Sequence, residues 1–259
     1  MKKNTLIFCV IILLTVSCTS KRDNPFDIHS NNYIAPSFTI DWAGSNISQN
    51  SIITKDSIYL SLIGNTEYNE FRHSMDNTYW HPWSTVSAIR EQYIDDGMHS
   101  LFIESRYANS SDVSRDTVKF TAAILPASAV YIYPWKQYTS VGDTASITIC
   151  TKNISGVYMM HCQIRGATIV KDSLLYTTSA NASVLSSDSV ADIAVLNDST
   201  PISGSIPVIA LSIANVNLTG KIDFSCVLRD KNNNTVSSET VRGCYILQSA
   251  TVRKNVTTP

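Results

Sequence analysis

The sequence predicts an all-β protein with two consecutive β-sandwich domains behind a removable leader. Apolar and polar residues alternate with a period of two in short runs bounded by turn residues, for example at 57–62 and 145–151. This period is typical of strands with one buried face. No window carries a sustained apolar repeat of 3.6 residues, and only 16% of the residues are charged. The composition, rich in Ser, Thr, Asn, Ile and Val, suits sandwiches with polar outer faces.

Residues 1–17 have the features of a signal peptide. Met1-Lys2-Lys3 precedes an apolar run from Leu6 to Val16. A run of about eleven residues is too short for a ~30 Å hydrocarbon core, which needs ~20 residues, but it fits a secretory signal. The following stretch, TVSC, resembles a bacterial lipobox, with Thr15 where leucine is usual. The resemblance implies that Cys18 becomes the lipid-bearing first residue, while an ordinary signal peptide cut nearby is the alternative.

A lipid on Cys18 would fasten the chain to a membrane. We therefore expect an outer membrane lipoprotein of the cell envelope, either periplasmic or surface-exposed. Thr19 follows the cysteine where a retention signal would have Asp, which favours the outer membrane. Residues 18–36 are polar and end in Pro36, so we expect them to form a flexible tether.

The charge and the cysteine count narrow the function classes. Without Lys2 and Lys3 the chain has 18 basic against 21 acidic residues, a net charge of −3. It therefore lacks the basic field that nucleic acid binding needs. Four cysteines follow Cys18, at spacings unlike those of CxxC metal sites: Cys150, Cys162, Cys226 and Cys244. Exported proteins can form disulfides, but buried free thiols are an equal alternative here.

Residues 37–125 are predicted to form the first sandwich. Ile58, Leu60 and Leu62 form one apolar face of a strand. The run FRHSMDNTYWHPWS, followed by IDDGMHSLFIESR, resembles bacterial immunoglobulin/fibronectin-like modules. The resemblance implies a spacer domain and places Trp80 in its core.

Residues 126–249 are predicted to form the second sandwich, followed by a tail at 250–259. Three stretches occur in order: VYIYPWKQYTSVGDTASITICTKN, NISGVYMMHCQIRG and PISGSIPVIALSIANVNLTGKIDFSCVLRDKNNNTV. Together they resemble the cohesin module, a jelly-roll sandwich related to carbohydrate-binding domains. In cohesins, the strand that corresponds to 158–165 faces the dockerin partner. The residues expected to point outward in one row on it are Met159, His161, Gln163 and Arg165.

The remaining sequence patterns bear on catalysis, metal binding and sugar binding. GxSxG, HExxH and phosphate-loop motifs are missing from the sequence, which favours a non-catalytic protein without a cofactor. The run that starts at Asp230 opens like a calcium loop, but Thr235 and Val241 stand where Gly and Glu are needed, so we expect no metal site. Trp135 lies beside several tyrosines and is a candidate sugar-stacking residue, with packing at a sheet edge as the alternative.

These observations lead to a functional hypothesis. We expect a membrane-anchored, non-catalytic recognition lipoprotein whose cohesin-like domain binds a dockerin-like protein segment, or carbohydrate, in polysaccharide utilisation. The candidate binding residues are Met159, His161, Gln163, Arg165 and Trp135. One alternative is a structural, assembly or adhesion lipoprotein whose sandwiches are spacers, and another is a lipid-anchored enzyme.

Overall fold

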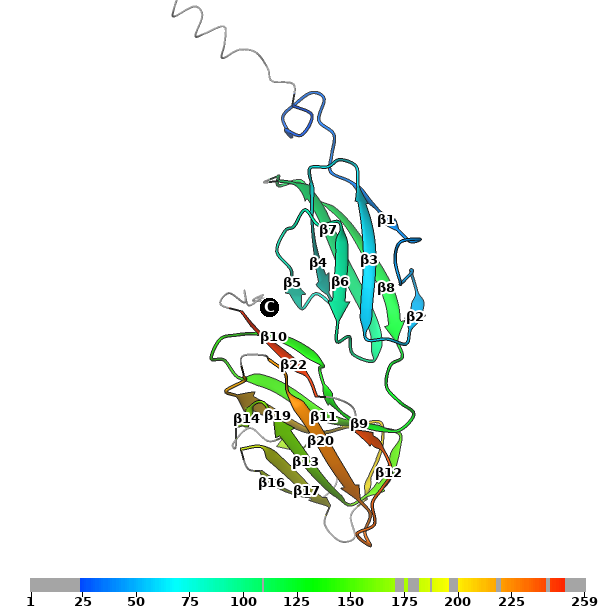
Figure 1. The fold of residues 1–259 in the computed structure, drawn as a ribbon, viewed down its shortest axis with the longest axis vertical. Helices are drawn as coiled ribbons and strands as arrows, with labels where there is room; N and C mark the ends of the chain where they lie inside the picture. The colour runs from blue at the N-terminus through cyan, green and yellow to red at the C-terminus, as the bar shows by residue number, and fades with distance from the viewer. Residues whose placement is uncertain are drawn as a thin grey trace, which may run out of the picture. The chain divides into compact units, whose positions relative to one another are not determined.

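The structure is a computed structural model built from β-strands, turns and loops (Figure 1). It describes residues 24–108, 110–170, 175–176, 182–186, 188–195, 200–217, 220–240 and 243–249. These ranges contain strands without any helix, which confirms the all-β class. They also hold no helix of the length and apolar character that a bilayer span requires. The predicted signal peptide (1–17), Cys18 and the tail (250–259) lie outside the described residues.

The first eight strands form two sheets. One has three strands in the order β1 (Phe38–Asp41), β3 (Ser57–Gly64) and β6 (Ala88–Gln92). The other has five strands in the order β2 (Ser51–Ile53), β8 (Ser114–Ala122), β7 (Gly97–Tyr107), β4 (Asn69–Met75) and β5 (Tyr79–Trp80). The predicted apolar face of β3 is confirmed, because Ile58, Leu60 and Leu62 are all buried.

The later strands form two larger sheets and two short pairs. The first large sheet runs in the order β14 (Thr168–Ile169), β19 (Pro207–Ala214), β11 (Ala145–Lys152), β9 (Ala129–Tyr133) and β21 (Glu239–Thr240), with β15 (Leu175–Tyr176) also on β19. The second runs in the order β16 (Ala182–Ser186), β17 (Val190–Val195), β13 (Met159–Arg165) and β20 (Asp223–Arg229). The pairs are β10 (Lys136–Ser140) with β22 (Tyr245–Ser249), and β12 (Ile154–Val157) with β18 (Ile202–Gly204).

One continuous apolar core lies between these two larger sheets. Because side chains alternate along a strand, Ile147 and Ile149 of β11 enter this core from one sheet. Met160 and Ile164 of β13 enter it from the other sheet. All four side chains are almost completely excluded from solvent. The opposite face of the β16–β17–β13–β20 sheet is therefore left for other contacts, and Figure 1 shows β13 in the interior of that sheet.

The chain divides by its contacts into two compact units. The first unit comprises Met1–Asp41, Ser61–Ala88 and Leu101–Thr117, and the second comprises Trp42–Leu60, Ile89–Ser100 and Val118–Pro259. This grouping differs from a division after residue 125. The domain boundary predicted from the sequence therefore stays a prediction.

Residues 24–36 form a folded segment of the first unit, in contrast to the flexible tether expected at 18–36. The ring of Phe26 packs against the rings of Tyr68 and Tyr107, with centroid distances of 5.0 and 4.9 Å. Successive turns in the segment are closed by backbone hydrogen bonds. The polar composition did not predict this folded segment. One packed aromatic ring is enough to hold a short segment whose composition is otherwise typical of a linker.

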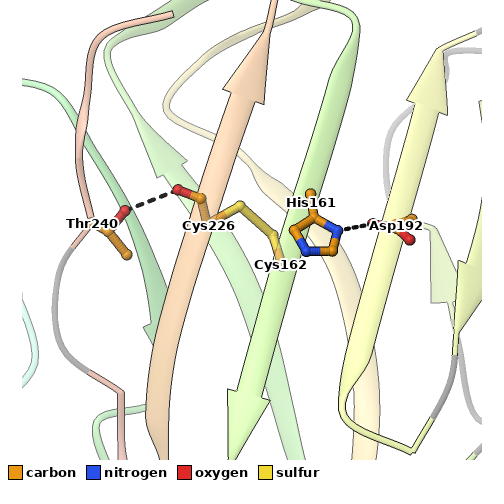
Figure 2. Close-up of a disulfide and its surroundings, with 5 residues drawn as sticks. All are labelled: His161, Cys162, Asp192, Cys226 and Thr240. Carbon is orange, nitrogen blue, oxygen red and sulfur yellow. Dashed lines mark hydrogen bonds and ion pairs between the residues drawn. A yellow bond between two sulfur atoms is a disulfide. The ribbon is translucent and has the colours of Figure 1, made fainter. Parts of the chain in front are cut away.

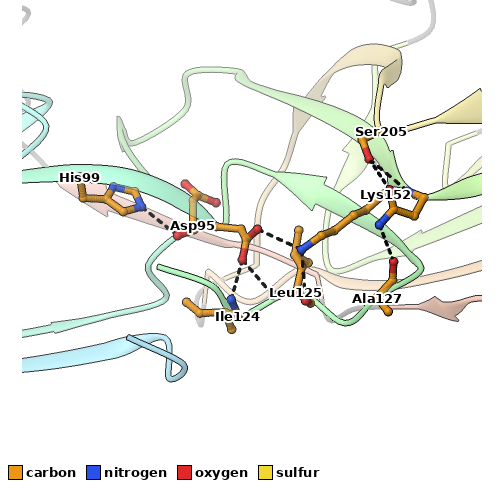
Figure 3. Close-up of polar contacts among 9 residues, drawn as sticks. Asp95, His99, Ile124, Leu125, Ala127, Lys152 and Ser205 are labelled. Atoms are coloured by element: carbon orange, nitrogen blue, oxygen red, sulfur yellow. Dashed lines mark hydrogen bonds and ion pairs between the residues drawn. The ribbon is translucent and has the colours of Figure 1, made fainter. Parts of the chain in front are cut away.

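Two consecutive aspartates, Asp95 and Asp96, accept hydrogen bonds from several parts of the second unit (Figure 3). Oδ1 of Asp96 accepts hydrogen bonds from the backbone N–H groups of Ile124 and Leu125, at 2.5 and 2.9 Å. Its Oδ2 lies 3.3 Å from Nζ of Lys152. Oδ1 of Asp95 accepts from the backbone N–H of Trp135 at 2.7 Å. The two carboxylates thus satisfy backbone donors of residues that lie between strands, after β8 and between β9 and β10.

Candidate functional site

The outward row predicted on β13 is confirmed as a geometric feature. Along this strand exposed and buried positions alternate. Met160, Cys162 and Ile164 point into the core, so their neighbours point to the outer face. The residues on that outer face are Met159, His161, Gln163 and Arg165.

Strand register brings further side chains beside this row. Opposite Met159 lie Ala194 of β17 and Arg229 of β20. The next outward position, His161, faces Asp192 of β17 on one side and Val227 of β20 on the other. Directly opposed residues in antiparallel strands share a face of the sheet.

A groove of about 380 Å³ lies on this face. Its apolar part includes Met159 and Val227, which are 38% and 42% exposed. Large apolar side chains at that exposure in one concave surface are typical of a contact surface. The described residues that line the groove are Met159, Met160, His161, Asp192, Ile193, Ala194, Val227, Arg229 and Asn233.

His161 and Asp192 form the polar wall of the groove. Nδ1 of His161 lies 2.5 Å from Oδ1 of Asp192 (Figure 2). The carboxylate fixes the imidazole and selects the tautomer with a proton on Nδ1. Because Nδ1 is engaged, Nε2 is the ring nitrogen that a bound group would meet.

Arg229 and a self-bonded turn form the far end of the groove. The guanidinium of Arg229 donates to the carbonyl of Asn233 at 3.1 Å and to the hydroxyl of Thr235 at 3.3 Å. Both acceptors are neutral, so these two hydrogen bonds bring no carboxylate to the guanidinium. The turn itself is held by Asp230, whose Oδ1 accepts from the backbone N–H groups of Asn232 and Asn234, each at 2.8 Å.

The carboxylate of Asp230 therefore serves the turn. Hydrogen bonds from Asn234 lower its pKa, and the backbone N–H of Asn232 adds to that effect. An Asx-type turn of this kind explains the run of asparagines after Asp230 without a calcium ion.

A disulfide joins β13 and β20 on the inner side of the groove sheet. Cys162 and Cys226 are directly opposed in the register, with Cα atoms 4.1 Å apart (Figure 2). Cys150 and Cys244 are free and buried. The sequence left open whether these four cysteines form disulfides or stay as buried thiols. In the structure they form one disulfide and two buried free thiols.

The structure separates the predicted site residues. Met159 and His161 line the groove, whereas Gln163 and Arg165 are not among its lining residues, although they lie on the same face. The guanidinium of Arg165 instead donates to Oε1 of Gln163 at 3.0 Å.

Trp135 is wrong as a sugar-stacking residue. It is 1% exposed and packs in a small cluster with Leu125 and Ala129, with Tyr93 and Tyr131 against it. A ring without solvent-exposed area cannot stack on a ligand. Of the tyrosines near Trp135 in the sequence, Tyr131 packs against this cluster, whereas Tyr133 is 50% exposed.

Sequence reasoning missed the contributions of β17 and β20. Asp192, Ala194, Val227 and Arg229 all sit at alternate positions of runs that read as strands. That alternation could have marked them as outward-facing. Their convergence with β13 depends on the sheet order, which the local pattern does not contain.

In chemical terms, the groove combines an apolar floor, a hydrogen-bonding imidazole and a cation. These are the elements of a surface that binds a side chain or a short segment. The described lining residues include no serine, threonine or cysteine that His161 could activate as a nucleophile.

Comparisons with known proteins give distant structural likenesses. No family model matches the chain, and no curated protein matches it. A type II cohesin domain from the cellulosome of Acetivibrio cellulolyticus is 16% identical, covering 45% of this chain and 93% of that one, with a TM-score of 0.29.

Two further solved structures are similar. A non-cellulosomal cohesin from the archaeon Archaeoglobus fulgidus is 11% identical over 47% of this chain and 91% of that one, with a TM-score of 0.31. The fibronectin(III)-like modules of CbhA from Clostridium thermocellum are 10% identical over 82% and 95%, with a TM-score of 0.28.

Proposed function

We propose that the chain is a non-catalytic recognition lipoprotein whose groove on the β17–β13–β20 face binds a dockerin-like segment of a partner protein. The observation that carries this proposal is the exposure of Met159 and Val227, at diagonal positions of neighbouring strands, in a concave surface with a polar rim. Burying both side chains against a partner would be favourable at ~25 cal/mol per Å² of apolar area.

A protein segment fits the groove better than a polysaccharide. Sugars bind by stacking on aromatic rings and by dense hydrogen bonding. None of the described residues that line the groove is Trp, Tyr or Phe, and much of the lining is aliphatic or thioether. Methionine adapts to apolar side chains of varied shape, which is a property of protein-binding surfaces.

The charges indicate what the segment should carry. Arg229 donates to the neutral acceptors of Asn233 and Thr235, while Asp192 is already paired with His161. A segment with an apolar residue for the floor and an acidic or carbonyl group near Arg229 would complement this arrangement.

The anchor and the location belong to the same proposal. Lipidation of Cys18 would hold the recognition groove at the cell envelope, with the outer membrane as the expected site. A dockerin-like partner would then be retained at the surface where polysaccharide is used. The alternatives are a structural or adhesion lipoprotein and a lipid-anchored enzyme.

The groove is tested with purified dockerin modules and with peptides selected from a random display library. Binding is measured by isothermal titration calorimetry. We expect Met159→Asp to weaken the binding of any captured ligand at least tenfold, equal to about 1.4 kcal/mol, because it places a charge in the apolar floor.

Arg165→Ala provides the matched control, since Arg165 lies on the same strand face outside the groove. We expect its affinity to stay within about twofold of the parent. Equal losses for both variants would argue against the groove. Retention on a polysaccharide panel, with no protein ligand found, would favour the carbohydrate alternative.

The anchor is tested separately with Cys18→Ser in the full chain. We expect the variant to move from the membrane fraction to the soluble fraction and to change in mature size. A variant that stays with the membrane at unchanged size contradicts lipidation at Cys18.

A further inference from the structure

An apolar tip lies on the first unit, where its N-terminal segment folds back. Ile28, Ile34 and Tyr68 are 50%, 52% and 54% exposed. All three lie on or against the folded segment 24–36: the ring of Phe26 packs on that of Tyr68, and the backbone N–H of Ile34 donates to the carbonyl of Pro25 at 2.8 Å. We call these three residues the apolar tip.

The tip rests on a firmly held segment. The hydroxyl of Tyr33 donates to Oδ2 of Asp112 at 2.6 Å, and burial followed by this contact raises the pKa of Tyr33 to about 12. The hydroxyl therefore stays a donor at any physiological pH. Nδ2 of Asn65 donates to the carbonyl of Ala35 at 3.1 Å. These contacts hold the chain on both sides of Ile34.

The length of chain before this segment limits where the tip can go. Cys18 and Asn24 are separated by six Cα–Cα steps. At 3.3–3.6 Å per residue, Asn24 lies at most about 22 Å from the attachment point of a lipid on Cys18. A lipid surface is thus the one partner that the anchor would bring to the tip at all times.

We propose that the apolar tip of Ile28, Ile34 and Tyr68 contacts the interfacial layer of the membrane to which the chain is anchored. The proposal rests on the proposed lipid anchor. Moving an exposed isoleucine side chain from water to the headgroup–acyl boundary is favourable because its apolar area is buried. Tyrosine favours the same layer because its ring is apolar and its hydroxyl is polar. The lipid anchor holds the protein at the membrane, so the contact of the tip is effectively intramolecular. A weak contact is therefore enough to add to the affinity of the anchor.

The chemistry also predicts that anionic lipid is not required. Lys21 and Arg22 precede the segment, but Asp23, Asp27 and Glu67 offset them. The contact should therefore depend on apolar area and should occur on neutral bilayers as well.

The test uses the mature chain, residues 19–259, with a hexahistidine tag in place of Cys18, bound to vesicles that contain a nickel-chelating lipid. This anchor works whether or not Cys18 is lipidated in cells, so the outcome for the tip is separate from the Cys18→Ser result. The photocrosslinking residue p-benzoylphenylalanine replaces Ile28 in one protein. In a control it replaces Thr78, which follows the far end of β4 in the same unit.

We expect lipid adducts from position 28 to exceed those from position 78 at least about fivefold, on phosphatidylcholine alone and on mixtures with phosphatidylglycerol. Adding Ile34→Asp to the position-28 protein should lower its lipid adducts by a similar factor. Val86→Asp removes a 63% exposed apolar side chain from the same unit and should leave the adducts unchanged.

Equal adduct yields at positions 28 and 78 would overturn the proposal. So would an unchanged yield in Ile34→Asp, or adducts that appear only with anionic lipid. Each variant is first checked for the thermal unfolding midpoint of the parent, and all the altered side chains are exposed.

Discussion

Cys162 on β13 and Cys226 on β20 are directly opposed and joined by a disulfide on the inner side of the sheet whose outer side carries the groove. The residues next to them in the chain, His161 and Val227, are opposed in the same way on the outer side. The disulfide therefore fixes the register in which the two strands present the groove.

Replacing both cysteines with alanine should destabilise the protein and loosen the strand register on which the groove depends. The disulfide closes a loop with a sequence separation of 64 residues, and the chain-entropy model gives about 4 kcal/mol for such a loop. Urea unfolding of Cys162→Ala/Cys226→Ala should show that decrease in the free energy of unfolding. An unchanged midpoint would contradict a stabilising disulfide.

The first strands and the outward row on β13 could be predicted because they depend on local alternation. Ile58, Leu60 and Leu62 each follow the period of two, and so do Met159 and His161. The groove could not be predicted in full, because Asp192 and Val227 reach it only through the pairing of β17 and β20 with β13.

Two tryptophans show where local patterns fail. Trp135 was expected to be a candidate platform and is buried. Trp80 was expected in the core and is half-buried, with the guanidinium of Arg72 over its ring at 4.7 Å. Whether an aromatic ring is covered depends on which distant side chain meets it, and a single sequence does not state that.

Glu104 should contribute far more to stability than its exposed partner Arg115. Its side chain is 6% exposed and accepts from Arg72 at 2.5 Å and from Arg115 at 2.7 Å. Burial acts to raise its pKa, but the hydrogen bonds from the two arginines outweigh this and lower it. We expect Glu104→Ala to cost about 3 kcal/mol, because it leaves Arg72 without its carboxylate.

Arg115→Ala is the control for Glu104, and we expect it to cost less than about 1 kcal/mol, because the Arg115 side chain is 71% exposed. Both values come from chemical denaturation of the same chain. Similar losses for the two variants would show that Glu104 does not act as a buried charge.

Asp96→Asn should remove part of the acid sensitivity of the second unit. Burial acts to raise the pKa of Asp96, but hydrogen bonds from the backbone of Leu125 and Ile124, then from Lys152, give a net lowering from 3.8. A carboxylate with a lowered folded pKa stabilises above its unfolded pKa, and this contribution is lost as pH falls through the folded value.

We expect Asp96→Asn to cost about 1–3 kcal/mol at pH 7 and to show a shallower loss of stability below pH 4. The measurement is the free energy of unfolding between pH 7 and pH 2. Asp143→Asn, in an exposed turn of the same unit, should follow the parent curve. Parallel curves for Asp96→Asn and the parent would rule out this role.

The two free thiols should be inert in the folded protein. Burial raises the pKa of Cys150 to about 11 and that of Cys244 to about 12. Only the thiolate reacts with disulfide reagents, so at pH 8 both should react at least about 100-fold more slowly than an unhindered thiol.

The mature chain from residue 19 lacks Cys18, and its disulfide occupies the other two cysteines. With a chromogenic disulfide reagent it should show two thiols after unfolding in urea and essentially none before. Rapid native labelling would contradict the burial of Cys150 on β11 or of Cys244 just before β22.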